Sequence, residues 1–207
     1  FYPMHIFAVS QFTKNELIAL GANKNNISVT YNGVNLEKFN LAYADENKIK
    51  NEFNIPDENI VIGHVGAMST NTKGQHILIN DFAKLVKEFS NITLICVGDG
   101  NSKSSFEDLV KELDLGNKVI FTGRRFDIPD MQAAFDIFCL NSIWGEMFPN
   151  AILEAMSMGN PWVGSEISGL PELTADNKAG VVVPPGDINA LYEELKILIT
   201  SKEERDR

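Results

Sequence analysis

The chain has 207 residues, of which 44% are hydrophobic and 22% are charged, proportions typical of a soluble globular protein. This length allows one large domain or two small ones, and no apolar run approaches the roughly 18 to 20 residues of a membrane-spanning helix. The formal net charge is -10, which argues against a nucleic-acid partner, because such proteins usually carry a basic excess.

The first 40 residues are predicted to form a unit that differs from the rest of the chain. A strand is predicted over Ile6–Val9, a helix over Gln11–Leu20 and a second strand over Ile27–Tyr31. A short polar helix, Asp45–Phe53, then joins this unit to the following residues. We interpret the unit as the tail of a preceding α/β domain.

From residue 60 onwards, short β-rich runs alternate with helical patterns. Strands are predicted over Ile60–Val65, Ile92–Val97, Lys118–Thr122, Asp136–Leu140, Pro161–Gly164 and Gly180–Val183. Helices are predicted over Gln75–Phe89, Ser104–Leu113, Ile128–Phe135, Pro149–Met158, Pro171–Ala175 and Asp187–Thr200, with a charged helical stretch over Ser201–Arg207. This alternation, with apolar runs in the strands, predicts an α/β fold with a doubly wound parallel sheet.

The cysteines and histidines point to no disulfide and no metal site. Cys96 and Cys139 lie in the middle of apolar runs, so both are predicted to be buried, reduced thiols, as in a cytosolic protein. His5, His64 and His76 lack metal-ligand spacing, and no metal is expected.

The unusual residues of the chain follow the predicted strands. In open α/β sheets, ligands bind beyond the carboxyl ends of the strands, so one shared cleft is predicted. The loops expected to form it are Gly66–Gly74, Gly98–Gly100, Gly123–Arg125, Ser142–Glu146 and Ser165–Glu172. Neither a complete dinucleotide-binding glycine motif nor a Walker phosphate loop is present.

Two glutamates stand out because they lie eight positions apart in a mainly apolar segment. Glu154 and Ser157 are the only polar residues of the run Ala151–Met158, so this helix is predicted to be buried nearly all round. An unpaired carboxylate there would be costly, so Glu154 needs a partner or a ligand. Glu154 paired with a buried arginine, and Glu146 as an ordinary loop acid, are the alternatives.

Positive groups for an anionic ligand are few. Lys73, which precedes Gly74, and the pair Arg124 and Arg125 are the candidates, with solvated surface charges as the alternative. The helix that begins at Pro149 also offers unpaired N–H groups to a phosphate or a sugar hydroxyl, unless it is an ordinary capped helix.

Together these residues resemble the donor-binding half of retaining glycosyltransferases with the GT-B fold, family 4 in particular. The family pattern E-G-F-P-x-x-x-x-E-A-M-A-x-G-x-P is matched by Glu146-Met147-Phe148-Pro149, Glu154-Ala155-Met156-Ser157, Gly159 and Pro161. Shorter matches are Val97–Gly100, Phe121–Arg124, Gly169–Glu172, Val183–Asp187, Val9–Thr13 and Tyr31–Val34. The resemblance covers nearly the whole chain.

The resemblance implies a role for each matched position. Glu154 would hold the ribose of a nucleotide sugar, Glu146 would contact the transferred sugar without acting as a nucleophile, and Lys73 would neutralise the diphosphate. The loop Gly123–Asp127 would lie beside the base. The catalytic residue implied is Glu146, and the donor-binding residues are Gly66, Lys73, Arg124, Arg125, Phe148, Asn150, Ala151 and Glu154.

The sequence departs from the family pattern at two positions. Ala67 replaces an arginine that often precedes the family's lysine, so we expect Arg124 or Arg125 to compensate, or donor affinity to be lower. Met147 replaces the usual glycine after the first glutamate and is expected to narrow the sugar pocket.

The resemblance also implies an organisation and a set of partners. Residues 1–33 would be the tail of an N-terminal acceptor domain, and residues 34–207 a donor domain whose last helices are truncated. The donor would be a UDP-, GDP- or ADP-sugar and the acceptor a glycan or a lipid-linked glycan, without a metal or other cofactor. The expected location is cytoplasmic, with peripheral membrane attachment of the full-length enzyme left open.

The chain alone is expected to bind a nucleotide sugar weakly and to transfer nothing, because the acceptor would bind to the absent domain. Two alternatives remain. One is a non-catalytic nucleotide-binding α/β module, and the other is a sugar-nucleotide epimerase of the GT-B type.

Overall fold

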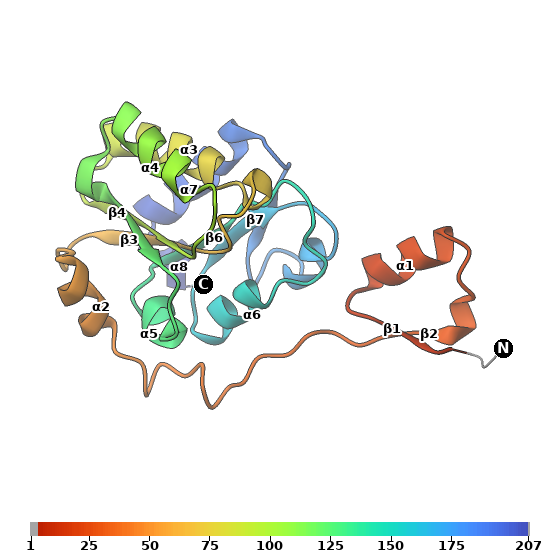
Figure 1. Cartoon of the computed structure of the whole chain (residues 1–207). Coiled ribbons are helices and arrows are strands. Elements are labelled where there is room, and N and C mark those ends of the chain that lie inside the picture. The colour runs from red at the N-terminus through yellow and green to blue at the C-terminus, as the bar shows by residue number, and fades with distance from the viewer. Residues whose placement is uncertain (1–3, 207) are drawn as a thin grey trace.

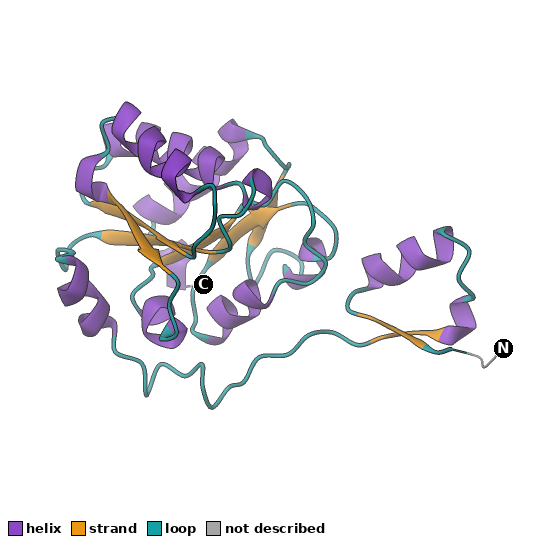
Figure 2. Ribbon diagram, viewed as in Figure 1, coloured by secondary structure: helices purple, strands orange, loops and turns teal. Residues whose placement is uncertain are grey.

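The computed structural model of the protein describes residues 4–206, and its main body is a six-stranded parallel sheet covered by helices on both faces (Figures 1 and 2). The strand order is β5-β4-β3-β6-β7-β8. The strands are β3 (Ile60–Val65), β4 (Ile92–Val97), β5 (Val119–Gly123), β6 (Ile137–Leu140), β7 (Trp162–Ser165) and β8 (Val181–Val183). The order reverses direction between β3 and β6, which makes this the switch point of the sheet.

One face of the sheet is covered by three helices, each of which contributes an apolar stripe. In one of them, Leu78, Phe82 and Leu85 recur with helical spacing and are fully buried against the strands. These helices are α3 (Gln75–Glu88), α4 (Lys103–Glu112) and α7 (Ile188–Thr200). Asp187 caps α7, as its carboxylate accepts hydrogen bonds from the N–H groups of Asn189 and Ala190, both at 3.0 Å.

The opposite face carries a second core. Its buried side chains include Ile49, Met131 and Ile152, each from a different helix. The helices are α2 (Glu46–Phe53), α5 (Ile128–Ala133) and α6 (Asn150–Ser157). Layers on both faces explain why every residue of β4 is buried and why its sequence shows no alternation of apolar and polar residues.

The first residues form a separate two-stranded parallel sheet with one helix, the N-terminal unit (residues 4–32). It consists of β1 (Ile6–Ala8), α1 (Gln11–Ala19), the 3₁₀ turn η1 (Lys24–Asn26) and β2 (Ile27–Val29). A long extended connection leads from this unit to α2 (Figure 1). Residues 1–3 and Arg207 lie outside the described residues, and so do the ends of the predicted segments 1–33, 34–207 and Ser201–Arg207.

The predicted α/β fold with a doubly wound parallel sheet is confirmed, and each predicted strand lies within two residues of an observed one. The predicted helix Pro171–Ala175 is instead the 3₁₀ turn η4 (Leu170–Leu173), and the last helix is α8 (Lys202–Asp206). Cys96 and Cys139 are buried and unpaired with each other, as expected. Within residues 4–206, no helix has both the length and the apolar character needed to cross a membrane.

The prediction that the helix around Glu154 is buried nearly all round is wrong. Within α6 only Ile152 and Ala155 are fully buried, and the other positions from 151 to 157 are partly exposed. The helix packs on the sheet through one stripe because it lies in the outer layer. Its partly exposed positions include the apolar Leu153 and Met156 together with the polar Glu154 and Ser157.

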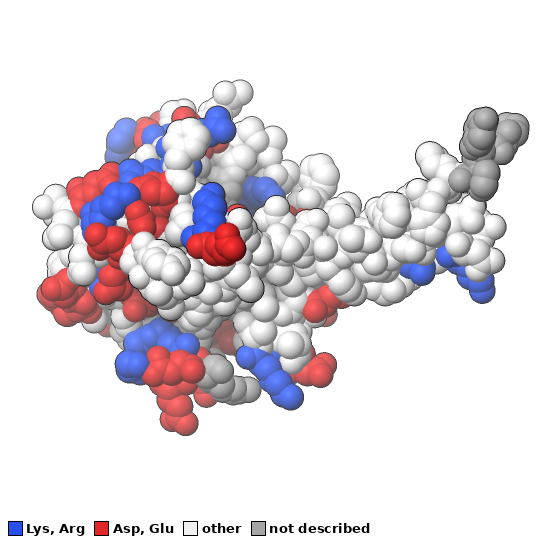
Figure 3. Space-filling view, turned by 90° about the horizontal axis from the view of Figure 1, so that it is seen from below, with Lys and Arg blue, Asp and Glu red and all other residues white. Residues whose placement is uncertain are grey.

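Charged side chains are mixed on the face that Figure 3 shows. Lysines and arginines gather there next to aspartates and glutamates over the main body, and the part that carries the N-terminal unit is mostly uncharged. Basic side chains on this face therefore lie beside acids instead of forming a basic stripe.

Candidate active site

An ion pair joins the loops that follow β3 and β6 at the switch point of the sheet. Lys73 ends the 3₁₀ turn η2 (Asn71–Lys73), and its Nζ pairs with Oε1 of Glu146. Ser142 donates a hydrogen bond of 2.8 Å to the same oxygen. Glu146 is 5% exposed, so its charge is stabilised by these two partners instead of by water.

Backbone contacts lock the same two loops together. The Ile143 N–H donates to the Thr72 carbonyl at 2.7 Å, and the Asn141 side chain donates to the Gly74 carbonyl at 2.8 Å. Gly74 has φ +73°, and a Cβ at this position would lie only 2.1 Å from the Asn141 carbonyl oxygen. A glycine is therefore required where the turn that carries Lys73 meets the loop that carries Glu146.

A cavity of about 720 Å³ lies beside this ion pair, between the loops that follow β3, β4 and β5. A Cβ on Gly98 would lie 2.0 Å from the Gly66 carbonyl oxygen, so the first two loops touch through their backbones. Gly66 also adjoins Lys73, whose Cγ is 3.6 Å from the place of a Gly66 Cβ. The cavity is lined by Val65, Gly66, Ala67, Val97, Gly98, Asp99, Gly100, Asn101, Arg124, Arg125 and Ile128.

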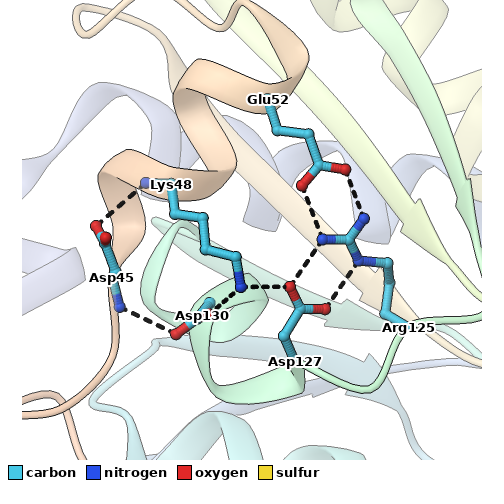
Figure 4. Close-up of polar contacts among 6 residues, drawn as sticks. All are labelled: Asp45, Lys48, Glu52, Arg125, Asp127 and Asp130. Carbon is cyan, nitrogen blue, oxygen red and sulfur yellow. Dashed lines mark hydrogen bonds and ion pairs between the residues drawn. The ribbon is translucent and has the colours of Figure 1, made fainter.

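Arg125 lines the cavity, but carboxylates already surround its guanidinium group (Figure 4). Its NH1 and NH2 atoms donate to the two oxygens of Glu52 at 2.6 and 2.8 Å, and it also makes two hydrogen bonds to Asp127, at 2.9 and 2.8 Å. These bonds hold the pKa of Asp127 well below its ordinary value. Arg125 therefore ties α2 to the loop after β5, and its predicted contact with the donor stays a prediction.

Lys48 extends this network to α5. Its Nζ donates to Asp127 at 2.8 Å and to Asp130 at 2.6 Å, and Asp130 accepts a hydrogen bond from the Asp45 N–H at 3.1 Å (Figure 4). The network fixes α2 against α5 and so supports one wall of the cavity.

Arg124 differs from its neighbour. Its guanidinium carbon lies 5.4 Å from the centroid of the Phe126 ring, and within residues 4–206 it makes no ion pair. Its charge at the cavity is therefore available to an anion, and its predicted donor contact stays a prediction.

Glu154 lies half-buried on α6 and does not line the cavity. Desolvation raises the pKa of its carboxyl group, and the charge of Lys38 opposes this shift. Within residues 4–206 its carboxylate has no hydrogen bond and no ion pair, so the alternative of a buried pair with an arginine is wrong. Of the two glutamates, Glu146 is the one whose carboxylate is buried and ion-paired.

The other residues predicted for the site lie where α6 begins. Phe148 is buried, and its carbonyl accepts a hydrogen bond of 2.8 Å from the Asn32 side chain. Asn150 is exposed and Ala151 partly exposed, and no side chain of the described residues 4–206 caps the start of α6. The backbone N–H groups of this first turn are therefore accessible to a ligand.

Sequence reasoning missed several supporting residues. His64 is fully buried; its Nδ1 donates to the Cys139 carbonyl at 3.0 Å, and burial lowers its pKa to about 4. Gln75 is also buried and donates to the Ala67 carbonyl at 3.1 Å. His64 interrupts the apolar run of β3, and this polar interruption was the one signal available for it, whereas Gln75, between Gly74 and His76, carried no such signal. Nothing in the sequence singled out Ser142 except its place in the predicted loop Ser142–Glu146.

Metal ligation has no candidate among the described residues. Within residues 4–206, no group of three or more His, Cys, Asp and Glu side chains is arranged to hold a metal ion. The expectation that no metal or other cofactor is needed stays a prediction.

The architecture is that of GT-B glycosyltransferase structures. The crystal structure of HepE from Anabaena in complex with UDP and glucose matches with a TM-score of 0.89 and 28% identity, over 98% of this chain and 55% of that one. The family model described as glycosyl transferases group 1 matches residues 45–207. The chain belongs to this family.

Curated relatives include enzymes of different pathways. The N-acetyl-alpha-D-glucosaminyl L-malate synthase of Bacillus anthracis is 27% identical, over 96% of this chain and 51% of the relative. The amylovoran biosynthesis glycosyltransferase AmsK of Erwinia amylovora is 30% identical, over 90% of this chain and 45% of the relative. The chain thus spans about half the length of these relatives.

Proposed function

We propose that this chain is the donor-binding, C-terminal part of a retaining family 4 glycosyltransferase, and that it binds a nucleotide-diphosphate sugar. The observation that carries the proposal is the Lys73–Glu146 ion pair at the switch point, beside a cavity of about 720 Å³. Membership of the family and the HepE structures, which contain UDP with glucose or UDP-glucose, support it. In this proposal residues 1–33 end the acceptor domain and residues 34–207 form the donor domain.

The donor would lie across the carboxyl ends of the strands. Its base would occupy the cavity beside the loop 123–127, and its diphosphate would lie between Lys73 and the start of α6. Glu154 would accept hydrogen bonds from the ribose hydroxyls, which would compensate the desolvation that raises its pKa. Glu146 would accept hydrogen bonds from the transferred sugar.

The reaction breaks the bond between the anomeric carbon and the diphosphate oxygen. The electron pair moves to that oxygen, and the anomeric carbon forms a bond with the acceptor oxygen, whose proton leaves with the diphosphate. Lys73 and the N–H groups of Asn150 and Ala151 would stabilise the developing negative charge. Glu146 would orient the sugar and stabilise positive charge near the anomeric carbon, without forming a covalent bond.

The ion pair prepares the site for this donor. In the structure Lys73 neutralises Glu146, and Ser142 provides that carboxylate with a second partner. When the diphosphate approaches Lys73, the ammonium group can contact both anions, while Ser142 keeps Glu146 in place. A fixed geometry of this kind avoids reorganisation during the reaction.

The acceptor and the cellular context belong to the whole enzyme. We propose that a glycan or a lipid-linked glycan binds to the N-terminal domain, in the cytoplasm, with peripheral membrane contact and no metal. The names of relatives such as AmsK and the capsular polysaccharide biosynthesis glycosyltransferase CapM of Staphylococcus aureus support a role in polysaccharide synthesis. A hexose is the expected sugar.

A thermal-shift panel of UDP-, GDP- and ADP-sugars tests the proposal. One nucleotide sugar should raise the melting temperature of the wild type in a concentration-dependent way, because ligand binding stabilises the native state by RT ln(1 + [L]/Kd). Glu154→Ala should reduce this shift, whereas Glu112→Ala, a change of an exposed acid on α4, should not. Absence of a shift with every nucleotide sugar at millimolar concentration would contradict the proposal.

A further inference from the structure

A second cluster of contacts joins the N-terminal unit to the loops of the candidate site, and Glu172 lies at its centre. Glu172 belongs to η4, the turn that follows β7. Its carboxylate accepts hydrogen bonds from the Gln11 N–H at 2.9 Å, the Phe12 N–H at 2.8 Å and the Tyr31 hydroxyl at 3.0 Å. All three donors belong to the N-terminal unit.

These contacts complete the start of a helix from a distant part of the chain. Gln11 and Phe12 are the first two residues of α1, and the next N–H, that of Thr13, donates to its own cap residue Ser10 at 3.0 Å. The first three N–H groups of α1 are thereby satisfied. The negative charge of Glu172 also lies at the positive end of the helix dipole, where an acid is stabilised.

The same unit touches the loop that carries Glu146. The Thr13 hydroxyl donates to the Met147 sulfur at 3.6 Å, and the Asn32 side chain donates to the Phe148 carbonyl at 2.8 Å. The ring centroids of Tyr31 and Phe148 are 4.9 Å apart. Met147 and Phe148 directly follow Glu146, so the N-terminal unit holds the backbone of this loop.

Gly169, just before η4, brings the three parts together. A Cβ at this position would lie 2.0 Å from the Met147 carbonyl oxygen and 2.9 Å from the Ser10 Cβ. The start of η4, the cap of α1 and the Glu146 loop therefore pack without a gap. The cap of α1, through Ser10, and the Glu146 loop, through Met147, thus share Gly169 as a packing neighbour.

We propose that Glu172 is a positioning residue that keeps the Glu146 loop in its sugar-binding geometry by anchoring α1 and Tyr31. The inference rests on the proposed function of Glu146. Lys73 and Ser142 fix the carboxylate of Glu146, and Glu172 fixes the backbone after it through the N-terminal unit. Loss of Glu172 frees this loop, whereas the loops around the cavity, after β3, β4 and β5, keep their contacts.

The test combines hydrogen exchange and calorimetry on the chain as it stands. The variants are Glu172→Ala and Glu172→Gln, with Glu112→Ala as the control. In the ligand-free chain, exchange over residues 145–150 and at the start of α1 should become faster in Glu172→Ala, should change less in Glu172→Gln, and should not change in the control. The Gln variant keeps one neutral acceptor and preserves the fold.

Calorimetry should show a selective loss. Glu172→Ala should lower the affinity for UDP-glucose by about tenfold, the effect of losing hydrogen bonds to a charged group, and should lower the affinity for UDP clearly less, because Lys73 and the loops around the cavity still hold the nucleotide. Equal losses for UDP and UDP-glucose, or unchanged exchange over residues 145–150 in a folded variant, would overturn the inference. If the wild type binds neither ligand, the proposed function fails, and the exchange measurement still decides whether Glu172 holds the loop.

Discussion

At the scale of single residues, buried charge is tolerated where a partner is fixed in place. Glu146 is almost fully buried, and it receives both an ammonium group and a hydroxyl hydrogen bond. Buried ion pairs contribute little net stability, because desolvation of the two charges offsets their attraction. A functional role therefore explains the Lys73–Glu146 pair better than a stabilising one. Glu154, which lacks a charged hydrogen-bonding partner within residues 4–206, is desolvated without such compensation.

Asp81 offers a test of buried charge away from the site. It is fully buried on α3; one oxygen contacts Lys84 at 3.2 Å, and within residues 4–206 the other has no partner. Burial raises its pKa from an ordinary value of 3.8 to about 6. Between these values the folded state binds more protons than the unfolded state, so this group lowers stability as the pH rises towards 6.

The Asp81→Asn variant should therefore have a free energy of unfolding about 1–2 kcal/mol higher than that of the wild type at pH 7. This figure is discounted because solvent screens the charge of the half-exposed partner Lys84. The advantage should shrink strongly by pH 4 and vanish near pH 3, where both states of the wild type carry the proton. Urea unfolding at both pH values measures the difference. Asp108→Asn, on the surface of α4, should show no such trend, and a pH-independent difference for Asp81→Asn would contradict the account.

At the scale of elements, the site depends on loops whose backbones approach each other more closely than a Cβ atom at the contact would allow. The turn before α3 meets the Asn141 carbonyl, and the loop after β4 meets the Gly66 carbonyl, each through a glycine with positive φ. The sheet brings the loop ends together, and these glycines let the loops pack into one surface.

Gly74→Ala tests this close approach. The substitution places a Cβ 2.1 Å from a backbone oxygen at φ +73°, so we expect a loss of about 3 kcal/mol, from strain together with displacement of the Lys73 turn. Gly116→Ala is the matched control, because Gly116 also has a positive φ (+55°) but, among residues 4–206, only its own chain neighbours lie within 4 Å of where its Cβ would be. This substitution should cost about 1 kcal/mol. Equal urea midpoints for the two variants would show that the contact with Asn141 is not tight.

The helices and strands could be predicted from local sequence, but the direct contacts between distant residues could not. The apolar run Ile92–Val97 identified β4 because a strand buried on both faces needs no polar residue. The strand-end rule also predicted that the loops bearing Lys73 and Glu146 converge. Their direct ion pair joins residues 73 positions apart, and no local pattern encodes such a contact.

One wrong prediction and one unpredicted contact have the same origin. An apolar composition predicted burial for α6 all round, although an outer-layer helix buries only one stripe on the sheet. Arg125 pairs with Glu52 of α2, which lies 73 positions earlier in the chain, and no local pattern indicated this contact. In both cases tertiary placement decided what the local pattern left open.

At the scale of the whole molecule, the chain is about half of a typical relative. Its sheet supplies the proposed donor site, and the N-terminal unit contacts that site through Glu172 and Asn32. In the proposal, the acceptor site lies in the part of the enzyme that is not present in this chain.

We therefore expect the chain to bind its donor without transferring sugar. A coupled assay for released nucleoside diphosphate, with a glycan acceptor and saturating nucleotide sugar, should give no turnover above the background hydrolysis rate. Sugar transfer by this chain alone would contradict the proposed division between donor and acceptor sites.

The central claim is that the switch-point pair receives the diphosphate of a nucleotide sugar. Its most direct test is calorimetric titration of UDP and of uridine into the wild type and Lys73→Ala, with Lys111→Ala, an exposed lysine of α4, as the control. Lys73→Ala should weaken UDP binding by about tenfold or more and leave uridine binding unchanged, because only UDP carries the charge that Lys73 neutralises. Equal effects on UDP and uridine, or undiminished UDP binding by a folded Lys73→Ala variant, would contradict the account.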